Sequence, residues 1–429
     1  MYWIPKLHKN PYKSRYIANS TSCTTKSISI LLTSCLTIIK SHWKLYSSKV
    51  YENSGINIFW SIKNSGEFLD QLNNKDLRVS SVSTYDFSTL YTTLPHNLIK
   101  EKLTELIGRT FGREKKYIAC NYSRAFFTNE IYEGYYMWTG VDVCNALVFL
   151  LDNIFVRFGQ QIYRQVVGIP MGTNCAPLVA DLFLFCYEKE FMLRLDKINQ
   201  ANVISAFNDT SRYLDDICNV DNIYFAEFIP EIYPLELELN KASDSDTSAS
   251  FLDLNLTIVN NIISTSIYDK RDDFNFQIVN FPDLSGDVPR APSYGVYISQ
   301  LTRYARCCSY LQDFNKRNLN ITKKLLQQGF RFHKLRKSFT KFFKKSSLLL
   351  DKYQTNLKYF LNYGISHPYF YGDVIYSLRK IKIQPSFKNK FVKIINKFLK
   401  KGYKKAILKR SAEMVFSKYF IASCSQLFI

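Results

Sequence analysis

The sequence predicts an α+β body followed by a basic, helical C-terminal part. Within the first two thirds of the chain, β-rich segments and helical apolar repeats follow the order strand, helix, helix, helix, hairpin, strands. Beyond Gln300 the apolar pattern is helical and basic. The formal net charge of the 429-residue chain is +21, yet Arg303 to Arg410 holds 28 basic and 3 acidic residues, a net charge of +25. This order of elements is typical of an α+β protein with a helical appendage.

Composition excludes several classes of protein. With 46% hydrophobic and 16% aromatic residues, the chain can bury a large core, so it is neither disordered nor collagen-like, and its length suggests two or three domains or lobes. The ten cysteines are scattered without a Cys-x-x-Cys pair, which excludes a zinc finger and favours buried thiols in a reducing compartment. We expect no membrane association, because no long apolar run and no signal-peptide core occur.

The uneven charge suggests a partner. A basic lobe beside a nearly neutral body points to a polyanion, most often nucleic acid. A solvated, lysine-rich helical surface would carry the same charge, so charge alone leaves both interpretations open.

Local patterns predict the elements in the first half of the body. Residues 26–50 repeat apolar side chains at helical spacing, and Val79 to Phe87 is rich in the β-branched and aromatic residues of a strand. Pro95 is placed to begin a helix that runs to Gly108. Val141 to Phe158 is expected to be a further helix, followed by a strand at Ile162 to Val167.

The second half of the body contains a long helix and several strands. After the turn GIPMGTN, a helix is expected from about Cys175 to Leu195, because leucine and phenylalanine recur on one side. Arg212 to Val220 is expected to be a hairpin around two adjacent acids. Phe251 to Tyr268 is expected to form two short strands joined at Asn260-Asn261.

Two acidic sites are candidates for chemistry. Asp86 ends a β-rich segment, where an isolated acid is unusual unless it faces solvent or a metal. Asp215 and Asp216 are adjacent at a predicted hairpin tip, and a divalent cation would relieve the repulsion between their charges. Three carboxylates from two strands can hold two metal ions about 4 Å apart for in-line phosphoryl transfer. Asp-Asp is also common in ordinary turns, so the pair alone leaves a structural role open.

The motifs around these acids resemble those of one family. In chain order the matching segments are PKLHKNPYKSRYI at 5–17, YDFSTLYTTLP at 85–95, GIPMGTNCAPLVADLFLFCYE at 168–188, YLDD at 213–216, SFLDLNLTI at 250–258 and SIYDKRDDFNF at 266–276. YLDD is similar to the Tyr-x-Asp-Asp box of reverse transcriptases. Together the segments, which cover about residues 4 to 340, resemble the Penelope-like retroelement reverse transcriptases, relatives of telomerase catalytic subunits.

The resemblance implies a fold and an activity. It implies a right-hand polymerase: partial fingers at 1–80, a palm with an antiparallel sheet and embedded fingers–palm helices at 81–290, and a helical basic thumb with a C-terminal extension at 291–429. The implied activity is that of an RNA-directed DNA polymerase, a nucleotidyltransferase that extends a DNA primer along an RNA template with deoxynucleoside triphosphates. It implies two Mg²⁺ ions, with Mn²⁺ as a substitute. The retroelement class implies an intracellular, nuclear location, and the oligomeric state stays open.

The resemblance also assigns roles to individual residues. It implies that Asp86, Asp215 and Asp216 are catalytic and hold the metal ions together with the main-chain carbonyl of Phe87. The implied nucleotide-binding residues are Lys6, Arg15, Tyr91, Met171, Gly172 and Lys241. Tyr91 would exclude a ribose 2′ hydroxyl, while core packing remains an alternative for it. Lys6 and Arg15 would bind the triphosphate, while ordinary surface charge remains an alternative for them.

Primer and template contacts are implied for two further groups of residues. Phe251 and Leu252 would hold the primer end. Basic side chains would follow the phosphates of a template–primer duplex, with little sequence specificity. These are Arg303, Arg306, Lys323, Lys324, Arg331, Lys334, Arg336 and Lys337.

Two features depart from the family pattern. Gly295-Val296-Tyr297 matches only the first half of a GIY-YIG endonuclease signature, so no endonuclease domain is expected. The chain also begins inside the fingers motif, which suggests a truncated start. A truncated, catalytically inactive nucleic-acid-binding remnant of such an element is therefore the alternative to an active polymerase. A polymerase that uses a DNA template or ribonucleotides is a third hypothesis.

Overall fold

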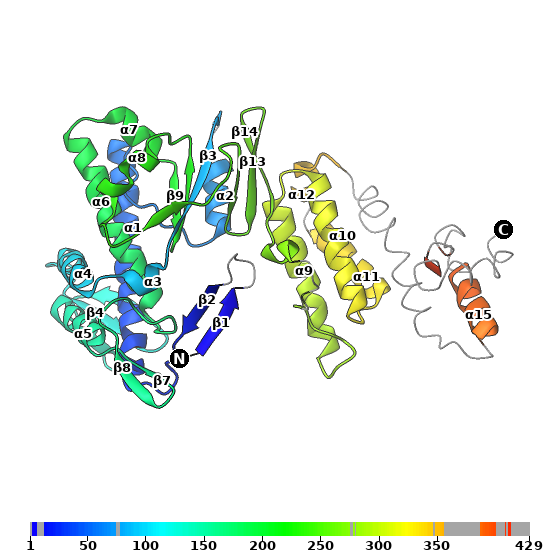
Figure 1. Cartoon of the computed structure of the whole chain (residues 1–429), viewed down its shortest axis with the longest axis horizontal. Coiled ribbons are helices and arrows are strands. Elements are labelled where there is room, and N and C mark those ends of the chain that lie inside the picture. Colours follow the sequence, from blue (N-terminus) through cyan, green and yellow to red (C-terminus); the bar gives the residue numbers. More distant parts are fainter. Residues whose placement is uncertain are drawn as a thin grey trace. The chain divides into compact units, whose positions relative to one another are not determined.

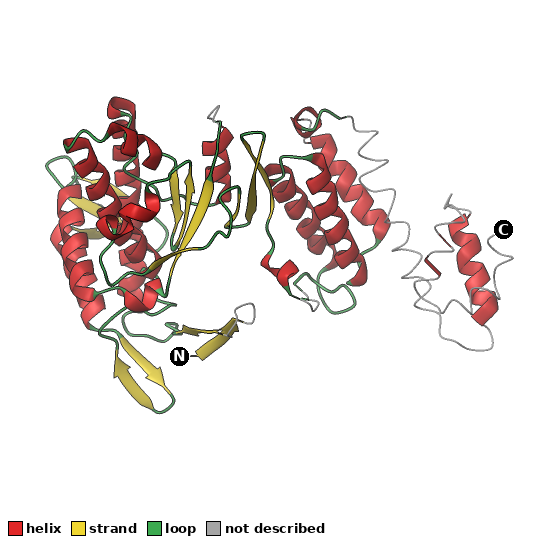
Figure 2. Ribbon diagram, turned by 45° about the horizontal axis from the view of Figure 1, so that its top comes forward, coloured by secondary structure: helices red, strands yellow, loops and turns green. Residues whose placement is uncertain are grey.

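The chain folds into two compact units, Met1–Ile263 and Ser264–Ile429, in the computed structural model (Figure 1). The structure describes residues 2–6, 13–73, 78–274, 278, 280–345, 348–355, 387–399, 408 and 411–412. The first unit mixes strands and helices, and the described part of the second unit is almost entirely helical (Figure 2). The predicted α+β class with a helical C-terminal part is therefore confirmed.

A four-stranded antiparallel sheet lies at the centre of the first unit. Its strand order is β11-β3-β10-β9. The strands are β3 (Val82–Phe87), β9 (Thr210–Tyr213), β10 (Asp216–Val220) and β11 (Leu239–Lys241). β9 and β10 form a hairpin with a two-residue turn, and β10 also pairs with β3. The strand predicted at Val79–Phe87 and the hairpin predicted at Arg212–Val220 are thus both present, as neighbours in one sheet.

Helices cover one face of this sheet (Figure 1). They are α1 (Lys26–Ser54), α6 (Ala176–Lys197) and α8 (Phe225–Ile232). Tyr85 of β3 packs against Phe225 with ring centroids 4.8 Å apart, and Phe87 packs against Tyr233 at 5.0 Å. Because successive residues of a strand point to opposite faces, Tyr85 and Phe87 enter this core while Asp86 points to the other face.

The predicted apolar repeats explain the long helices. In α1 the buried side chains recur every three or four residues, as at Leu32, Cys35, Leu36, Ile39 and Trp43. The helix ends where Gly55 takes a φ of 71°, a left-handed conformation that glycine adopts without strain. The helices predicted at 26–50 and at about 175–195 are confirmed, as is the helix after Pro95, which is α4 (His96–Thr110).

A second layer covers part of the sheet's other face. It contains α2 (Ser65–Asn73) and a hairpin of β12 (Ser248–Phe251) and β13 (Leu254–Val259). Phe68 of α2 packs against Phe251 of β12, with ring centroids 5.0 Å apart. Ser211 of β9 donates a hydrogen bond to Gln71 of α2 (3.0 Å), which fixes the helix against this face.

One expected helix is only partly correct. The helix predicted at Val141–Phe158 is α5 (Gly140–Asp152), which begins with a capping box between Thr139 and Asp142. Residues Phe155–Phe158 instead form β7, which pairs with β8 (Gln161–Arg164). The aromatic and β-branched residues of β7 favour a strand once β8 offers a partner, and this pairing outweighs the helical spacing of the apolar residues.

Smaller elements complete the first unit. A two-stranded hairpin, β1 (Tyr2–Lys6) and β2 (Lys13–Ile17), begins the chain. A small sheet has the order β5-β4-β6. The other elements are α3 (Leu90–Thr93), β4 (Tyr117–Cys120), β5 (Ala125–Thr128), β6 (Tyr136–Trp138) and α7 (Ala201–Phe207). None of these was expected from the sequence, because short elements have weak periodicity.

The expected turn at Asn260-Asn261 is present. It joins β13 to β14 (Ile262–Ile267), and both asparagines take left-handed φ values of 52° and 62°. Asparagine tolerates this conformation better than most residues, which explains why the pair marks the turn.

The second unit is built from amphipathic helices. Its described elements are η1 (Lys270–Asp273), α9 (Arg290–Cys307), α10 (Leu311–Gln327), α11 (Phe332–Lys345), α12 (Leu348–Lys352) and α15 (Phe387–Leu399). α9 packs against both α10 and α11. Tyr297 is buried in α9 and donates a hydrogen bond to Asn318 of α10 (2.8 Å). The half-signature Gly295-Val296-Tyr297 is therefore part of a helix whose tyrosine belongs to the core.

No helix within the described ranges is both long enough and apolar enough to cross a membrane.

Candidate active site in the first unit

A row of polar side chains crosses the central sheet. Asp86 of β3 lies directly opposite Asp216 of β10, and on its other side it lies opposite Asn240 of β11. Tyr213 of β9 continues the row beyond Asp216. Directly opposed residues share one face of a sheet, and like charges in that position destabilise the pairing. The half-buried Asp86–Asp216 pair is therefore a feature that packing alone does not favour.

The third predicted carboxylate lies in the turn next to this pair. Leu214 and Asp215 form the two-residue turn of the β9–β10 hairpin, and Leu214 takes a left-handed φ of 54°. A leucine in this conformation is strained, and such strain persists only where the surroundings hold it. The main-chain amide of Phe87 donates to the carbonyl of Asp215 (3.2 Å). This bond ties the turn to the strand that carries Asp86.

The donor types suit a hard divalent cation, although the side chains are not closed around one point. Mg²⁺ prefers carboxylate oxygens, and Asp86, Asp215 and Asp216 supply them from one strand and one hairpin. Across the described residues, no group of three or more His, Cys, Asp or Glu side chains is gathered closely enough to hold a metal ion. The two-ion site, including the carbonyl of Phe87, therefore stays a prediction.

A buried ionic network connects the β9–β10 hairpin to α6, and sequence reasoning missed it. Arg212, which is fully buried, contacts Asp181 (2.7 Å) and Glu188 (2.5 Å) of α6. The two acids are seven residues apart, about two helical turns, so they face the same way. Lys40 of α1 also pairs with Asp181 (2.5 Å), and Tyr233 donates to Glu188 (2.9 Å).

Arg212 connects this network to the turn. Its Nη1 also donates to the carbonyl of Leu214 (3.2 Å), the residue with the strained backbone. Burial alone would lower the pKa of the guanidinium, but the carboxylates of Glu188 and Asp181 outweigh burial and raise it. Burial likewise acts to raise the pKa of Asp181, while Arg212 and Lys40 lower it overall. The signal in the sequence was an arginine one residue before YLDD and two acids at helical spacing.

Tyr91 lies near the carboxylates. Its side chain is partly buried against the core, and burial together with the nearby Asp215 carboxylate raises the pKa of its phenol to about 12. The main-chain amide of Ile169 donates to the Tyr91 carbonyl (2.6 Å). The structure therefore brings Tyr91 together with Asp215 and with the GIPMG segment.

The GIPMG turn requires both of its glycines. A Cβ at Gly168 would lie 2.6 Å from the carbonyl oxygen of Tyr91, and a Cβ at Gly172 would lie 1.9 Å from that of Ala18. Gly172 also has a φ of 125°, which side chains rarely adopt. The Ala18 amide donates to the carbonyl of Met171 (2.8 Å). The predicted nucleotide-binding residues Met171 and Gly172 are thus fixed against the segment that follows β2.

One other predicted nucleotide-binding residue, Lys241, lies apart from the carboxylate row. Lys241 lies one position beyond Asn240 on β11, opposite Tyr85, so strand alternation directs it away from the face of Asp86. It forms an exposed ion pair with Asp246 (2.7 Å). Arg15 is exposed on β2, and the side chain of Lys6 lies outside the described residues. The structure does not bring Lys241 to the carboxylates.

The side chain of Phe251, a predicted primer contact, points into the protein. The Phe251 side chain is buried and packs against Phe68, so its ring belongs to the hydrophobic interior. Leu252 follows it in a two-residue turn with a φ of 56° and is partly exposed. An aromatic side chain in an apolar strand predicts burial as readily as it predicts a contact, which is why the sequence could not separate the two.

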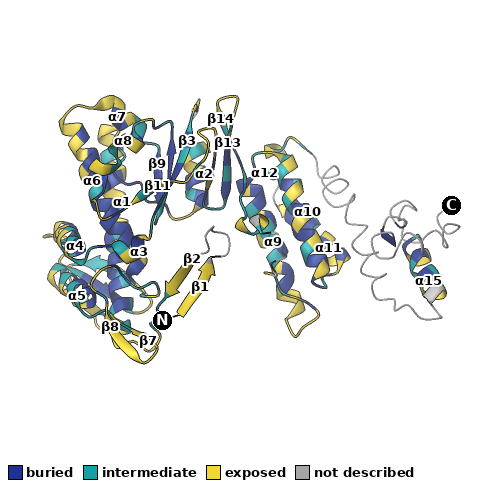
Figure 3. Cartoon of the chain, viewed as in Figure 1, coloured by how far each residue is buried: buried dark blue, intermediate teal, exposed yellow. Residues whose placement is uncertain are grey.

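The predicted duplex-binding side chains lie on the helices of the second unit. Arg306 of α9, Lys323 of α10 and the four basic residues predicted on or beside α11 are exposed, while Arg303 and Lys324 are partly buried (Figure 3). In α11 the buried residues alternate with basic ones at helical spacing. The four are Arg331, Lys334, Arg336 and Lys337. The aromatic residues form the core of these helices, as expected.

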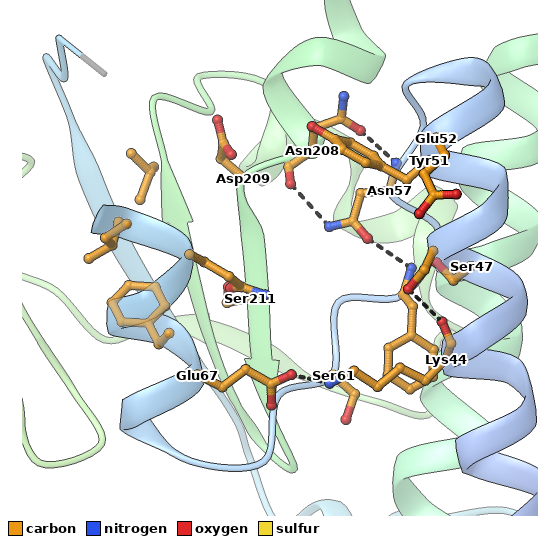
Figure 4. A pocket seen from close by; sticks show the side chains of 16 residues that line it. Lys44, Ser47, Tyr51, Glu52, Asn57, Ser61, Glu67, Asn208, Asp209 and Ser211 are labelled. Atoms are coloured by element: carbon orange, nitrogen blue, oxygen red, sulfur yellow. Dashed lines mark hydrogen bonds and ion pairs between the residues drawn. The ribbon is translucent and has the colours of Figure 1, made fainter. Parts of the chain in front are cut away.

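A cavity of about 530 Å³ opens on the same face of the sheet as the carboxylates, between α1, α2 and β9 (Figure 4). Ser211 and Val220 line it, and strand alternation gives both the same face as Asp216. Lys44 and Glu67 form an ion pair in its wall, and Asn57 donates to the carbonyl of Asn208 (3.1 Å). No pattern in the sequence indicates this cavity, because its walls come from segments far apart in the chain.

Comparison with known proteins gives structural likenesses only. No protein-family model matches the sequence, and no curated protein sequence matches it. The chain is similar to telomerase from Candida albicans, solved with a TWJ fragment of telomeric RNA (TM-score 0.41, 12% identity, 93% of this chain and 58% of that one). It is similar to apo telomerase from Candida tropicalis (0.40, 11%, 90% and 60%). It is also similar to the Sicinivirus 3Dpol RNA-dependent RNA polymerase (0.36, 14%, 68% and 54%). The chain spans less than two thirds of each of these proteins.

Proposed function

We propose that the chain is an RNA-directed DNA polymerase of a Penelope-like retroelement. The observation that carries this proposal is the direct opposition of Asp86 and Asp216 in the central sheet, with Asp215 in the adjoining turn. Two like charges face each other there at a cost to sheet pairing, and a cation-binding function accounts for that cost. The resemblance of the surrounding motifs to reverse transcriptases supports the same conclusion.

The three aspartates are the proposed ligands of two Mg²⁺ ions, or Mn²⁺ ions as substitutes. Such ions, when bound, supply activation of the primer 3′ hydroxyl and neutralisation of the leaving pyrophosphate. The protein contributes the placement of the carboxylates: β3 and β10 hold Asp86 and Asp216 in one register, and the Phe87 amide fixes the carbonyl of Asp215.

Tyr91 is the proposed selector of the sugar. Its carbonyl is bound by the Ile169 amide, so its backbone cannot move without moving the GIPMG turn. Its ring is partly buried against the core close to Asp215, which places a bulky group beside the carboxylates. A ring so constrained would exclude a ribose 2′ hydroxyl by contact and so favour deoxynucleoside triphosphates.

The remaining parts are assigned by the resemblance of the motifs and, for the basic helices, by charge. The central sheet and its helices are the proposed palm, the β1–β2 hairpin is part of the fingers, and the basic helices of the second unit are the thumb. Exposed lysines and arginines on α9 to α11 would contact the phosphates of an RNA–DNA duplex. A nuclear location is proposed from the retroelement class alone.

Primer extension tests the proposal. The full chain is incubated with a DNA primer on an RNA template, Mg²⁺ and deoxynucleoside triphosphates, and product length is measured. We expect extension by the natural chain, and its loss in Asp86→Asn. The matched control is Asp196→Asn, an exposed aspartate near the end of α6 that should extend normally.

Two results would contradict the proposal. If Asp86→Asn extends as well as the natural chain, the row of carboxylates is not the site. If the natural chain binds the duplex in a salt-dependent manner without extending it, the inactive nucleic-acid-binding remnant is the correct function.

A further inference from the structure

The β7–β8 hairpin exposes an unusual number of large apolar side chains. Phe155, Phe158, Ile162 and Tyr163 are 58%, 51%, 70% and 53% exposed. The hairpin is a two-stranded sheet of its own, and it extends from the body of the first unit (Figure 2). A cluster of exposed aromatic and aliphatic residues on a projecting hairpin marks an interaction surface.

The register divides these side chains between two faces. Val156 opposes Tyr163 and Phe158 opposes Gln161, so one face carries the rings of Phe158 and Tyr163 together with Val156 and Gln161. On the other face Arg157 opposes Ile162, and Arg164 opposes Phe155. Each arginine therefore stands beside an apolar side chain.

The charge of this surface favours an anionic partner. No Asp or Glu occurs from Asn153 through Ala180, whereas Arg157 and Arg164 both lie in the hairpin. At its base, a cavity of about 380 Å³ is lined by His96, Lys100 and Arg164 together with Asp152. Asp152 pairs with Lys100 (2.6 Å) and lies 3.8 Å from Arg164, and the Lys100 ammonium lowers its pKa.

The base of the hairpin is fixed to the candidate active site. The Gly168 amide donates to the carbonyl of Leu94 (2.8 Å), and His96 Nε2 lies 2.7 Å from the Gly168 carbonyl oxygen. Val167 forms an isolated bridge with Pro95. The segment from Leu94 to His96 directly follows α3, which begins four residues after Asp86. The hairpin is thus held by the segments that also position Tyr91 and the GIPMG turn.

We infer that the β7–β8 hairpin binds the unpaired 5′ extension of an RNA template. Two exposed rings and a glutamine on one face, two arginines on the other and no acid in either strand are the features of a platform for single-stranded nucleic acid. Bases would stack on Phe158 and Tyr163, and the positive charge of Arg157 and Arg164 on the opposite face would attract the phosphates of the same strand. The inference rests on the proposed function, since it takes the RNA template as the occupant.

The test compares two ligands for the full chain. One is a blunt RNA–DNA duplex, and the other has the same duplex with an unpaired 5′ RNA extension of about ten nucleotides. Fluorescence anisotropy measures affinity for each. The double variant Phe158→Ser/Tyr163→Ser is compared with Tyr122→Ser/Ile131→Ser, which removes two exposed side chains on either side of strand β5, in a different sheet.

We expect the natural chain to bind the extended ligand more tightly than the blunt one. The hairpin variant should lose about fivefold or more of that affinity and keep its affinity for the blunt duplex. The control should keep both. A photoreactive 5-iodouridine in the extension should crosslink to Tyr163 in the natural chain.

Four results would overturn the inference, and they separate it from the proposed function. Equal affinities for the blunt and extended ligands, or an unchanged affinity in the hairpin variant, would exclude the binding role of the hairpin. Neither result would contradict the proposed polymerase function. Self-association of the natural chain that disappears in the hairpin variant, measured by sedimentation, would make a second copy the occupant. Failure to bind either ligand would contradict the proposed function itself.

Discussion

Two hairpins of the first unit have turns with the same backbone conformation, but the residues that flank the two turns differ in character. In β9–β10 the turn region is Tyr213-Leu214-Asp215, and in β12–β13 it is Phe251-Leu252-Asp253. The leucines take nearly equal left-handed φ values, 54° and 56°. An aromatic residue, a leucine and an aspartate therefore produce the same backbone twice.

The two hairpins differ in how deeply the residues that flank the turn are buried. In β12–β13 the flanking Phe251 and Leu254 are both buried, so the hairpin contributes apolar packing. In β9–β10 the flanking Tyr213 and Asp216 are half exposed, and Asp216 faces Asp86. The turn alone is therefore no sign of function. The proposed chemistry depends on the residue after the turn and on its cross-strand partner.

The largest expected difference between the hairpins is catalytic. Asp216→Asn should lower the rate of primer extension about 10³-fold, since a metal ligand supplies several kcal/mol of charge stabilisation. Asp253→Asn, in the turn of the other hairpin, should change the rate less than about threefold. Single-nucleotide incorporation rates measure both. Comparable losses in the two variants would mean that the hairpins do not differ in function.

The next expected difference is in the free energy of unfolding, and here a substitution in the β12–β13 hairpin should have the larger effect. Phe251→Ala should lower the free energy of unfolding by about 3–5 kcal/mol, because it leaves a cavity beside Phe68. Tyr213→Ala, at the matching position of the other hairpin, should cost less, because Tyr213 is half exposed. Urea denaturation of the two variants decides this, and a larger loss for Tyr213→Ala would show that the carboxylate hairpin is the structural one.

The residue before each aromatic gives a third contrast. Arg212→Met should destabilise the protein by about 3–5 kcal/mol, because Asp181 and Glu188 would stay buried without their guanidinium partner. Ser250→Ala, at the matching exposed position, should change stability by about 0.5 kcal/mol or less. Thermal and urea denaturation of both variants provide the measurement.

The loss of stability in Arg212→Met should depend on pH, and the direction of this dependence follows from the pKa of Asp181. The pKa of Asp181 in the folded chain lies below its ordinary 3.8, so its pairing stabilises the protein above that value and is lost as the pH falls through the lowered one. Removal of Arg212 lets burial raise this pKa. The deficit of Arg212→Met should therefore be largest near neutral pH and shrink on acidification; a deficit that grows in acid would contradict this.

The smallest expected effect tests the shared turn. Leu214→Asn and Leu252→Asn should each relieve part of the left-handed strain, which is roughly 1–2 kcal/mol for an ordinary residue. We expect similar small gains in unfolding free energy at both positions, because the φ values match. A gain at Leu252 with none at Leu214 would show that the bond from Arg212 to the Leu214 carbonyl depends on the leucine.

The long elements and the carboxylate boxes could be predicted from the sequence. Helices α1 and α6 repeat buried residues over several turns, and the β9–β10 hairpin is marked by acids between apolar strands. Asn260-Asn261 marks its turn because asparagine tolerates a positive φ. In each case the signal lies within one segment, where spacing and turn chemistry suffice.

What sequence reasoning missed depends on contacts between distant segments. Phe155–Phe158 has helical spacing and became a strand because Gln161–Arg164 pairs with it. The burial of Arg212 could not be predicted, because it depends on ion pairs with Asp181 and Glu188, which lie 31 and 24 residues earlier in the chain. Their places in a motif predict binding roles for Phe251 and Lys241. The register of their strands directs the Phe251 side chain into the core and the Lys241 side chain away from the carboxylates.

The close approach of Gly172 to Ala18 limits how this protein could be recombined. The Ser20 hydroxyl donates to the Gly172 carbonyl (2.7 Å) across 152 residues of sequence, and the Ala18 amide donates to Met171. These two stretches behave as one part. A chimera that took its N-terminal strands from another chain would need that chain's version of the glycine turn as well, because neither half fits a foreign counterpart.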